Sequence, residues 1–167
     1  ACGDCANIFY NPTNEHRYIP LATNAVRMGT LVGLNIIEPS VKYIGTQGTS
    51  GIKIYDWNIS STGLTEGVAK ERGINYATVT VKDHNRPEFM PTFEDAILKI
   101  VFNKDTREIL GGQILSQIDL TEKMNTLSVC IQNKMTVEQL AFVDFFLQPH
   151  FNKPWSLLNV AGLSAIE

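Results

Sequence analysis

The feature that most limits how this chain can fold is an apolar alternation followed by a turn and a second extended run. Residues 96–102 carry an apolar side chain at every second position, which is typical of a β-strand that is partly covered on both faces. The polar stretch 103–106 predicts a turn, so residues 107–116 should return as a second strand. A glycine pair at 111–112 inside that strand predicts a bulge or a close backbone approach.

Further elements are expected on both sides of this hairpin. In chain order they are a loop at 7–18, a helix that opens at Pro20 and ends by Pro39, strands at 41–47 and 52–61 joined by a turn at 48–51, a helix at 66–72, a strand at 75–82, helices beginning near 119 and 136, and a last helix at 156–165. Strands followed by a group of helices predict an α+β fold, in which helices cover one side of an antiparallel sheet.

Helix starts and faces support this order of elements. Thr65 is a suitable N-cap, while Asp119 with Glu122 and Thr136 with Gln139 have the spacing of capping boxes. Two apolar stripes predict buried helix faces. Their members are Leu21, Ala25, Met28 and Val32 in the first helix, and Leu120, Met124, Leu127 and Ile131 in the helix after residue 119.

The character of the chain changes after Pro39, where the first helix gives way to strand-like sequence. A length of 167 residues fits one domain, or one domain with part of another. We therefore divide the chain at 1–40 and 41–167. The first residues read as the middle of a fold and carry no initiator Met, so we expect a piece of a longer polypeptide.

Charge and hydropathy exclude two classes of partner. The formal net charge is −3 and no basic run occurs, which argues against nucleic-acid binding. No apolar stretch approaches the roughly 20 residues of a membrane span, and no signal peptide opens the chain. We expect a soluble, cytoplasmic protein that has neither nucleic acid nor membrane as a partner.

Cys2 and Cys5 stand at the CxxC spacing of redox and metal sites, and Cys130 is the third cysteine. A pair of small, half-buried residues is the favoured interpretation, because no strand-to-helix redox context surrounds the pair. Zinc is less favoured, since no second CxxC or His pair exists. Cys130 lies on an expected amphipathic helix and should be in the core, whereas His16 and His84 lie in expected loops and should face solvent.

The N-terminal stretch resembles the end of a cofactor site. Gly3 would let the backbone approach a ligand, Asp4 can accept hydrogen bonds from hydroxyls, and a helix N-terminus follows. These residues are similar to the second flavin fingerprint of the pyridine nucleotide-disulfide oxidoreductases. The likeness is to the branch of NADH oxidase, NADH peroxidase and coenzyme A-disulfide reductase, and it extends over nearly the whole chain.

The resemblance implies that residues 1–40 are the C-terminal remnant of the FAD-binding domain and residues 41–167 the dimerisation domain. By the match, Asp4 would bind ribityl or phosphate-proximal hydroxyls of FAD, while Leu21, Ala22 and Thr23 would meet the flavin ring at the first helical turn. The implied partner is a second copy of the chain, in a homodimer. We expect the isolated segment to retain no cofactor.

The second distinctive stretch is rich in aromatic residues and runs from Asp144 to Trp155 with two prolines. Its aromatic side chains are Phe145, Phe146, Phe151 and Trp155, which present too much apolar surface for a solvent-facing loop. Asn152 is expected to cap the last helix, with Pro154 in its first turn. The stretch is similar to the family segment that borders the other subunit's flavin.

By that match the residues that line the partner's active site are Leu147, Gln148, Pro149 and His150. Histidine titrates near neutrality and could act as an acid or base. In the glutathione reductase branch a histidine in this region pairs with a glutamate, but Asn152-Lys153-Pro154 stands here instead. We therefore favour a structural or interface role for His150 over a catalytic one.

The chain lacks a Gly-x-Gly-x-x-Gly motif and the family's redox cysteine, so we expect no catalytic or metal-binding residue in this segment. The resemblance implies the dimerisation domain of an FAD-dependent, NADH oxidase-like flavoenzyme that oxidises NADH and reduces oxygen. Val26 occupies a place where the peroxidase branch tends to have arginine, and Phe151 and Trp155 stand where the coenzyme A-disulfide reductase branch has tyrosines. Those two branches are the alternatives, and a homodimerising module without cofactor is the alternative of another class.

Overall fold

The computed structural model describes all residues from Ala1 to Glu167. They form two compact units, Ala1–Gly48 and Thr49–Glu167. None of the helices combines the length and the apolar character that crossing a bilayer requires. The expected assignment of residues 1–40 to a FAD-binding domain and of 41–167 to a dimerisation domain stays a prediction.

The first unit opens with a short hairpin where the sequence predicts a loop. β1 (Ile8–Tyr10) pairs antiparallel with β2 (Glu15–Arg17), so the prediction of an irregular loop at 7–18 is wrong. Each strand has only three residues, too few to display a period of two. Asn14 closes the turn with a φ of 52°, a conformation that asparagine adopts more readily than most residues.

α1 (Ala22–Asn35) follows, with Leu21 as its N-cap, so Pro20 precedes the helix and does not lie in its first turn. The expected buried face is only partly covered, because Leu21, Ala25 and Met28 are half-buried and Val32 is exposed. Asn24 is the helix's single buried residue. Asn24 is held by hydrogen bonds. Its amide donates to the Ile19 carbonyl (3.1 Å) and its oxygen accepts from Thr46 (2.9 Å).

The segment 41–47 forms no strand, which corrects the sequence prediction. Its one sheet-like contact is the bridge between Thr46 and Tyr10, in which Thr46 N–H donates to the Phe9 carbonyl (2.9 Å). The apolar residues of 41–47 instead lie largely exposed beside α1, with Val41 and Ile44 among them. Composition suggested a strand here, but no neighbouring strand is present to complete the ladder.

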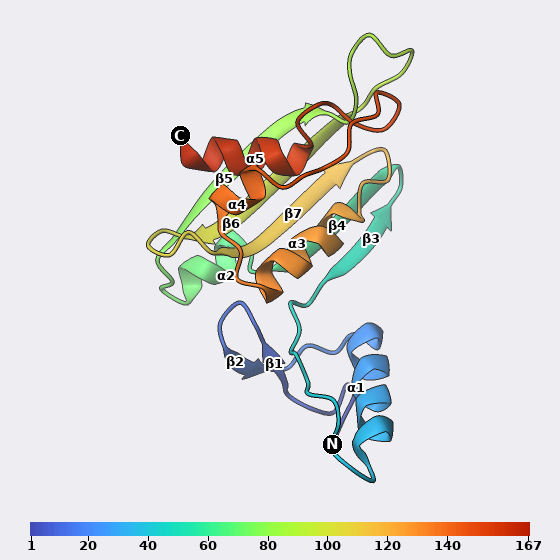
Figure 1. Cartoon of the computed structure of the whole chain (residues 1–167), viewed down its shortest axis with the longest axis vertical. Coiled ribbons are helices and arrows are strands. Elements are labelled where there is room, and N and C mark those ends of the chain that lie inside the picture. The colour runs from blue at the N-terminus through green and yellow to red at the C-terminus, as the bar shows by residue number, and fades with distance from the viewer. The chain divides into compact units, whose positions relative to one another are not determined.

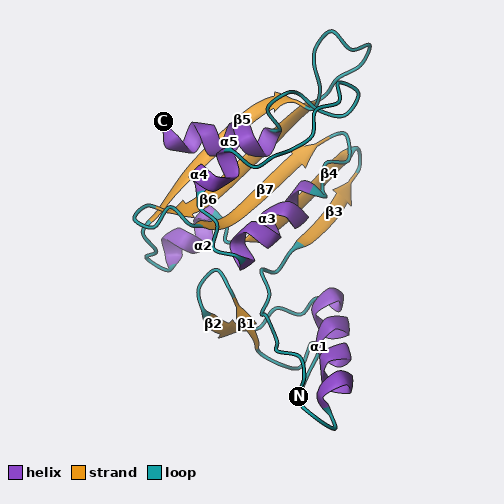
Figure 2. Cartoon of the chain, viewed as in Figure 1, coloured by secondary structure: helices purple, strands orange, loops and turns teal.

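The second unit contains one five-stranded sheet. The strands are β3 (Ser50–Ile54), β4 (Trp57–Gly63), β5 (Tyr76–His84), β6 (Asp95–Asn103) and β7 (Ile109–Ser116). Their spatial order is β3-β4-β7-β6-β5, and every neighbouring pair is antiparallel (Figure 2). The single strand predicted at 52–61, and the turn predicted at 48–51, are wrong. A tight turn at Tyr55 and Asp56 divides the segment, and Tyr55 has a φ of 50°.

The predicted β6–β7 hairpin is confirmed, and so is the special role of its glycines. Register shifts at Leu110, since Val101 pairs with Gly111 while Phe102 pairs with Ile109. A Cβ atom on Gly111 would lie 2.0 Å from the Leu64 carbonyl oxygen, which no side chain could tolerate. The glycine therefore allows the end of β4 to approach β7 closely.

Three helices, α3 (Lys123–Gln132), α4 (Val137–Ala141) and α5 (Leu157–Ile166), lie over one face of this sheet (Figure 1). α3 packs on β4 and β7, while α5 packs on α4, β5 and β6. The short α2 (Glu66–Glu71) connects β4 to β5. The predicted α+β class, an antiparallel sheet with helices on one side, is confirmed.

Two of the predicted caps form and two do not. Thr65 accepts a hydrogen bond from Val68 N–H, and Thr136 makes a full capping box with Gln139. Asp119 instead accepts from the Thr121 backbone and hydroxyl (3.0 and 2.6 Å), so its expected box with Glu122 is absent. The last helix is capped by Ser156 with Asn159, and not by Asn152.

The core of the second unit lies between the sheet and the helices. It contains Leu98, Ile100, Phe102, Ile114, Met124, Leu127, Cys130, Ile131, Leu140 and Leu158, all of them buried. The predicted stripe of α3 is therefore part of this core, as expected. Ile52, Trp57 and Ile97 lie on the face of the sheet opposite the buried row Leu98–Ile100 and keep substantial exposure.

The candidate flavin end and the aromatic turn

The N-terminal candidate residues gather at the start of α1. Gly3 has a φ of 79°, a left-handed conformation that favours glycine, and a Cβ built on it would lie 3.6 Å from Ala25 Cβ. Gly3 therefore lies against the beginning of the helix, and the exposed Asp4 follows it directly. A carboxylate in this position can accept hydroxyl hydrogen bonds from a ligand.

The first turn of α1 has no side-chain cap. Leu21 adopts an extended conformation as N-cap, and Ala22 and Thr23 are exposed. The first N–H groups of a helix have no partner within the helix, and the positive end of the dipole adds to their attraction for an electron-rich atom. The turn at 21–23 can therefore bind a ligand oxygen or ring nitrogen through its backbone.

An apolar pocket of about 350 Å³ lies beside the same helix, and no sequence pattern predicts it. Val26, Leu31, Val41 and Ile44 contribute apolar walls, and Tyr43 lies among them. Partial burial raises the pKa of the Tyr43 hydroxyl, although the charge of Arg27 opposes this effect. The phenol therefore stays neutral at physiological pH.

The three cysteines are free thiols in different surroundings. The Cys5 thiol donates to the Cys2 carbonyl (3.4 Å), and the two sulfurs are not joined. No group of three or more His, Cys, Asp or Glu side chains is arranged to hold a metal ion. Cys130 is buried on the core side of α3, as predicted, and this burial raises its pKa to about 11.

The second candidate site is the segment between α4 and α5. Most of its large apolar side chains are exposed, from Phe142 (69%) and Phe146 (68%) to Phe151 (66%) and Trp155 (50%). Phe145 is the exception and packs against the core. The exposed rings contact one another edge to face, with centroids 6.5 Å apart for Phe146 and Phe151. We call residues 142–155 the aromatic segment.

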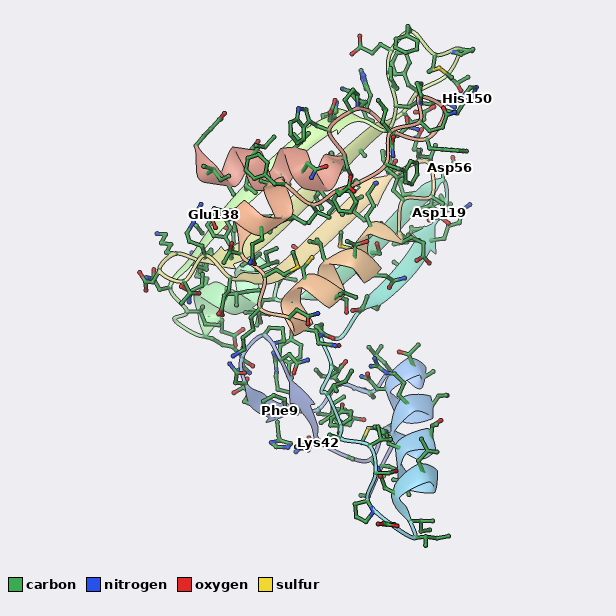
Figure 3. The ribbon with its side chains drawn as sticks, viewed as in Figure 1. Phe9, Lys42, Asp56, Asp119, Glu138 and His150 are labelled. Atoms are coloured by element: carbon green, nitrogen blue, oxygen red, sulfur yellow. The ribbon has the colours of Figure 1, made fainter.

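Leu147, Gln148, Pro149 and His150 lie together on one turn of the aromatic segment, and Figure 3 labels His150. Asn152 closes this turn, because its oxygen accepts from Gln148 N–H (3.0 Å) and its amide donates to the Phe146 carbonyl (2.8 Å). Phe151 N–H donates to the Gln148 carbonyl (2.8 Å). The turn is therefore well defined, while Leu147 remains 53% exposed.

The His150 ring is exposed and makes one side-chain contact within the chain, at 3.0 Å between Nδ1 and the Gln148 Oε1 atom. Its backbone N–H donates to the same Gln148 oxygen (2.9 Å). No carboxylate accompanies the ring, in contrast to a histidine–glutamate acid–base pair. This arrangement fits a recognition role better than proton transfer.

His84, expected in a solvent-facing loop, ends β5 and is half-buried, so that prediction is wrong. Its Nδ1 lies 2.9 Å from Glu88 and its Nε2 lies 3.2 Å from Asp95. His16 is exposed as expected, although it belongs to β2 and contacts Phe9 edge to face. The sequence pattern could not reveal the His84 contacts because they depend on the path of the loop after β5.

Comparison with known proteins gives a consistent result. Residues 49–157 match the family model described as pyridine nucleotide-disulphide oxidoreductase, dimerisation domain. The chain is 51% identical over its full length to NADH oxidase of Enterococcus faecalis and 41% identical over 99% of its length to NADH oxidase of Streptococcus pyogenes. It spans 37% and 36% of these proteins.

A solved structure is similar over nearly the whole chain. This is the water-forming NADH oxidase from Lactobacillus brevis bound to NADH, which superimposes with a TM-score of 0.98 at 51% identity. The match covers 99% of the present chain and 37% of that structure. The chain thus spans a little over a third of the proteins that it resembles.

Proposed function

The chain belongs to the pyridine nucleotide-disulphide oxidoreductases through their dimerisation domain, and from this premise we propose that it joins two subunits of an NADH oxidase-like flavoenzyme. The family depends on FAD and NAD and forms homodimers through this domain. In the proposed enzyme NADH is oxidised and oxygen is reduced. Because the chain spans about a third of its relatives, catalysis would belong to the full-length protein.

The observation that carries the proposal is the exposed aromatic segment of residues 142–155. Large apolar side chains on a well-defined turn lose little conformational entropy on association, which is typical of interface anchors. We therefore assign Leu147, Gln148, Pro149 and His150 to the border of the partner subunit's active site. Their part would be to exclude water and orient the ring system there, since none has the surroundings of an acid or base.

The first unit would supply the end of the flavin site, as the remnant of a FAD-binding domain. The exposed Asp4 fits the binding of cofactor hydroxyls, and the uncapped N–H groups at Leu21, Ala22 and Thr23 fit an electron-rich ring edge. FAD, when bound, supplies the electron-transfer chemistry. The residues of this chain bind and orient it.

Oxygen is the favoured electron acceptor, with peroxide and coenzyme A disulfide as the alternatives. Val26 is exposed on α1 and is uncharged, whereas the peroxidase branch, by the resemblance, tends to have an arginine at this position. The high identity to proteins named NADH oxidase supports the same choice. A homodimerising module without cofactor is the alternative of another class, and the cytoplasmic location stays a prediction.

A chimera tests the proposal directly. In it, this chain replaces the matching C-terminal 37% of the Enterococcus faecalis NADH oxidase. We expect a dimer with flavin absorbance that consumes oxygen when NADH is added. Leu147→Asp should lower its turnover by about tenfold or more, because misplaced groups at a reacting centre cost factors of that size.

Two controls make the result decisive. Tyr55→Asp changes a 91% exposed aromatic side chain on the β3–β4 turn, outside both candidate sites, and should leave turnover unchanged. Asp4→Ala should instead reduce the flavin retained on gel filtration. A dimeric, yellow chimera whose turnover is insensitive to Leu147→Asp would refute the assignment of the aromatic segment to the active site.

A further inference from the structure

We propose that Asp83, Arg86 and Lys153 form a clasp that fixes the turn carrying Leu147–His150, so that Arg86 and Lys153 are positioning residues. The inference rests on the proposed function, because that function gives the turn its role. The clasp connects the end of β5 and the loop after it to a segment 64 to 70 residues further along the chain. No sequence motif predicts these contacts.

The first tie is an ion pair. Lys153 Nζ lies 2.5 Å from Asp83 Oδ1, and both side chains are half-buried, at 30% and 24% exposure. The same Asp83 oxygen accepts from the His84 backbone N–H (2.8 Å), which fixes the carboxylate at the end of β5. The pair fixes the direction of the Lys153 side chain, because the carboxylate that it contacts is itself held at the end of the strand.

The second tie is made by the Arg86 guanidinium. Its Nη1 donates to the His150 carbonyl (3.2 Å), while its Nε and Nη2 donate to the Thr92 carbonyl and hydroxyl. The planar guanidinium of Arg86 thus joins Thr92, on the other side of the β5–β6 loop, to the turn at His150. Lysine could not reproduce these three directed contacts, because its ammonium is a single point charge.

The loop that carries Arg86 is itself anchored. His84 lies between Glu88 and Asp95, and Asp95 is also 2.6 Å from Lys82 Nζ. Asn85 accepts from Glu94 N–H through its side chain (2.8 Å) and donates to the Glu94 carbonyl through its backbone (3.0 Å). The clasp therefore joins the turn to a loop that is itself held by hydrogen bonds and ion pairs. Through this loop the backbone of His150 is held against the end of the sheet.

The two ties hold the end of the turn at His150 and Lys153. His150 is held through its carbonyl and Lys153 through its ammonium, and the intervening Phe151 and Asn152 both donate to the Gln148 carbonyl (2.8 and 2.9 Å). The bonds that remain in the turn are local and belong to exposed residues, so release of the clasp would let the turn open and expose the N–H groups of Phe151 and Asn152. The exposed Leu147 would then lose its fixed direction.

Amide hydrogen exchange of the 167-residue chain tests the clasp. Lys153→Met keeps the side chain's length but removes its charge, and Arg86→Lys keeps the charge but removes the fork. Each should speed exchange at Phe151 and Asn152 by about tenfold or more, since each removes a charge-assisted bond that opposes local opening. Exchange at the buried β6 residue Leu98 should not change.

Matched variants complete the test. Lys104→Met removes a lysine from the exposed β6–β7 turn and should leave exchange at Phe151 and Asn152 unchanged, and Lys153→Arg should restore slow exchange there. Unchanged exchange in both Lys153→Met and Arg86→Lys would overturn the clasp. An active-site assignment that fails in the chimera, alongside faster exchange in these variants, would refute the proposed function and leave the clasp supported.

Discussion

Among the single residues, Cys130 has the chemistry most altered by its surroundings. Its thiol is 3% exposed on the core side of α3, and burial raises its pKa to about 11. A free thiol titrates near 8.5, so the folded chain keeps the proton over a range in which the unfolded chain loses it. Cys2 and Cys5, by contrast, lie near the surface of the first unit.

Cys130 should therefore make stability depend on pH in the alkaline range. The raised pKa gives a contribution that is fully present below about pH 8.5 and is lost as the pH rises toward about 11, on the order of 3 kcal/mol. Urea unfolding of the wild type and of Cys130→Ala, followed from pH 7.5 upward, measures the difference. The wild type should lose stability relative to the variant, and parallel pH curves would contradict this account.

Residue-scale reasoning from sequence succeeded where chemistry is local. The core position of Cys130 follows from its place in an apolar helical stripe, and the close approach at Gly111 follows from a glycine inside a strand. The contacts of Arg86 with His150 could not be predicted, because they join residues 64 positions apart through two loops. Sequence periodicity predicts helices and strands, but it does not predict a contact between two distant loops.

At the scale of elements, α5 is attached to α4 by a buried polar side chain. Asn159 is 2% exposed, and its amide donates to the carbonyls of Leu140, Ala141 and Val143 at 3.1 to 3.2 Å. Its oxygen accepts from Ser156 N–H (3.1 Å), which completes the cap of α5. The Asn159 side chain therefore supplies hydrogen-bond partners both for the carbonyls at the end of α4 and for the backbone N–H at the start of α5.

Asn159→Ala should destabilise the second unit by about 2–4 kcal/mol, because three carbonyl groups at the end of α4 would each lose a hydrogen bond, two of them in buried positions. Asn125→Ala is the matched control, since Asn125 is exposed on α3 and contacts only Glu122 through its side chain. Its effect should remain within about 0.5 kcal/mol. Similar losses in the two variants, measured by urea unfolding, would show that Asn159 does not join the helices.

Elements were predictable from sequence when their periodicity was long or their caps were explicit. The alternation of β6 and the box at Thr136 and Gln139 fall in this group. The β3–β4 turn was missed because Tyr55 takes a left-handed conformation without the usual glycine or asparagine. The segment 41–47 was misassigned because apolar composition alone does not supply a pairing strand.

At the scale of the whole molecule, apolar surface remains exposed in both units. In the first unit it includes Ile36 and Ile37 after α1, and in the second it is concentrated in the aromatic segment of residues 142–155. Apolar patches of this kind mark surfaces that are covered in an assembly. The proposed dimer interface would cover the second patch.

The central claim is that the aromatic segment joins two copies of this chain, and light scattering coupled to gel filtration tests it most directly. We predict a mass about twice the 18.6 kDa of one chain, which falls to that of one chain in Phe151→Asp but not in Tyr55→Asp. The first variant places a charge in the proposed interface, and the second places one on the exposed β3–β4 turn. A wild-type chain that has the mass of a single copy at every concentration would contradict the claim.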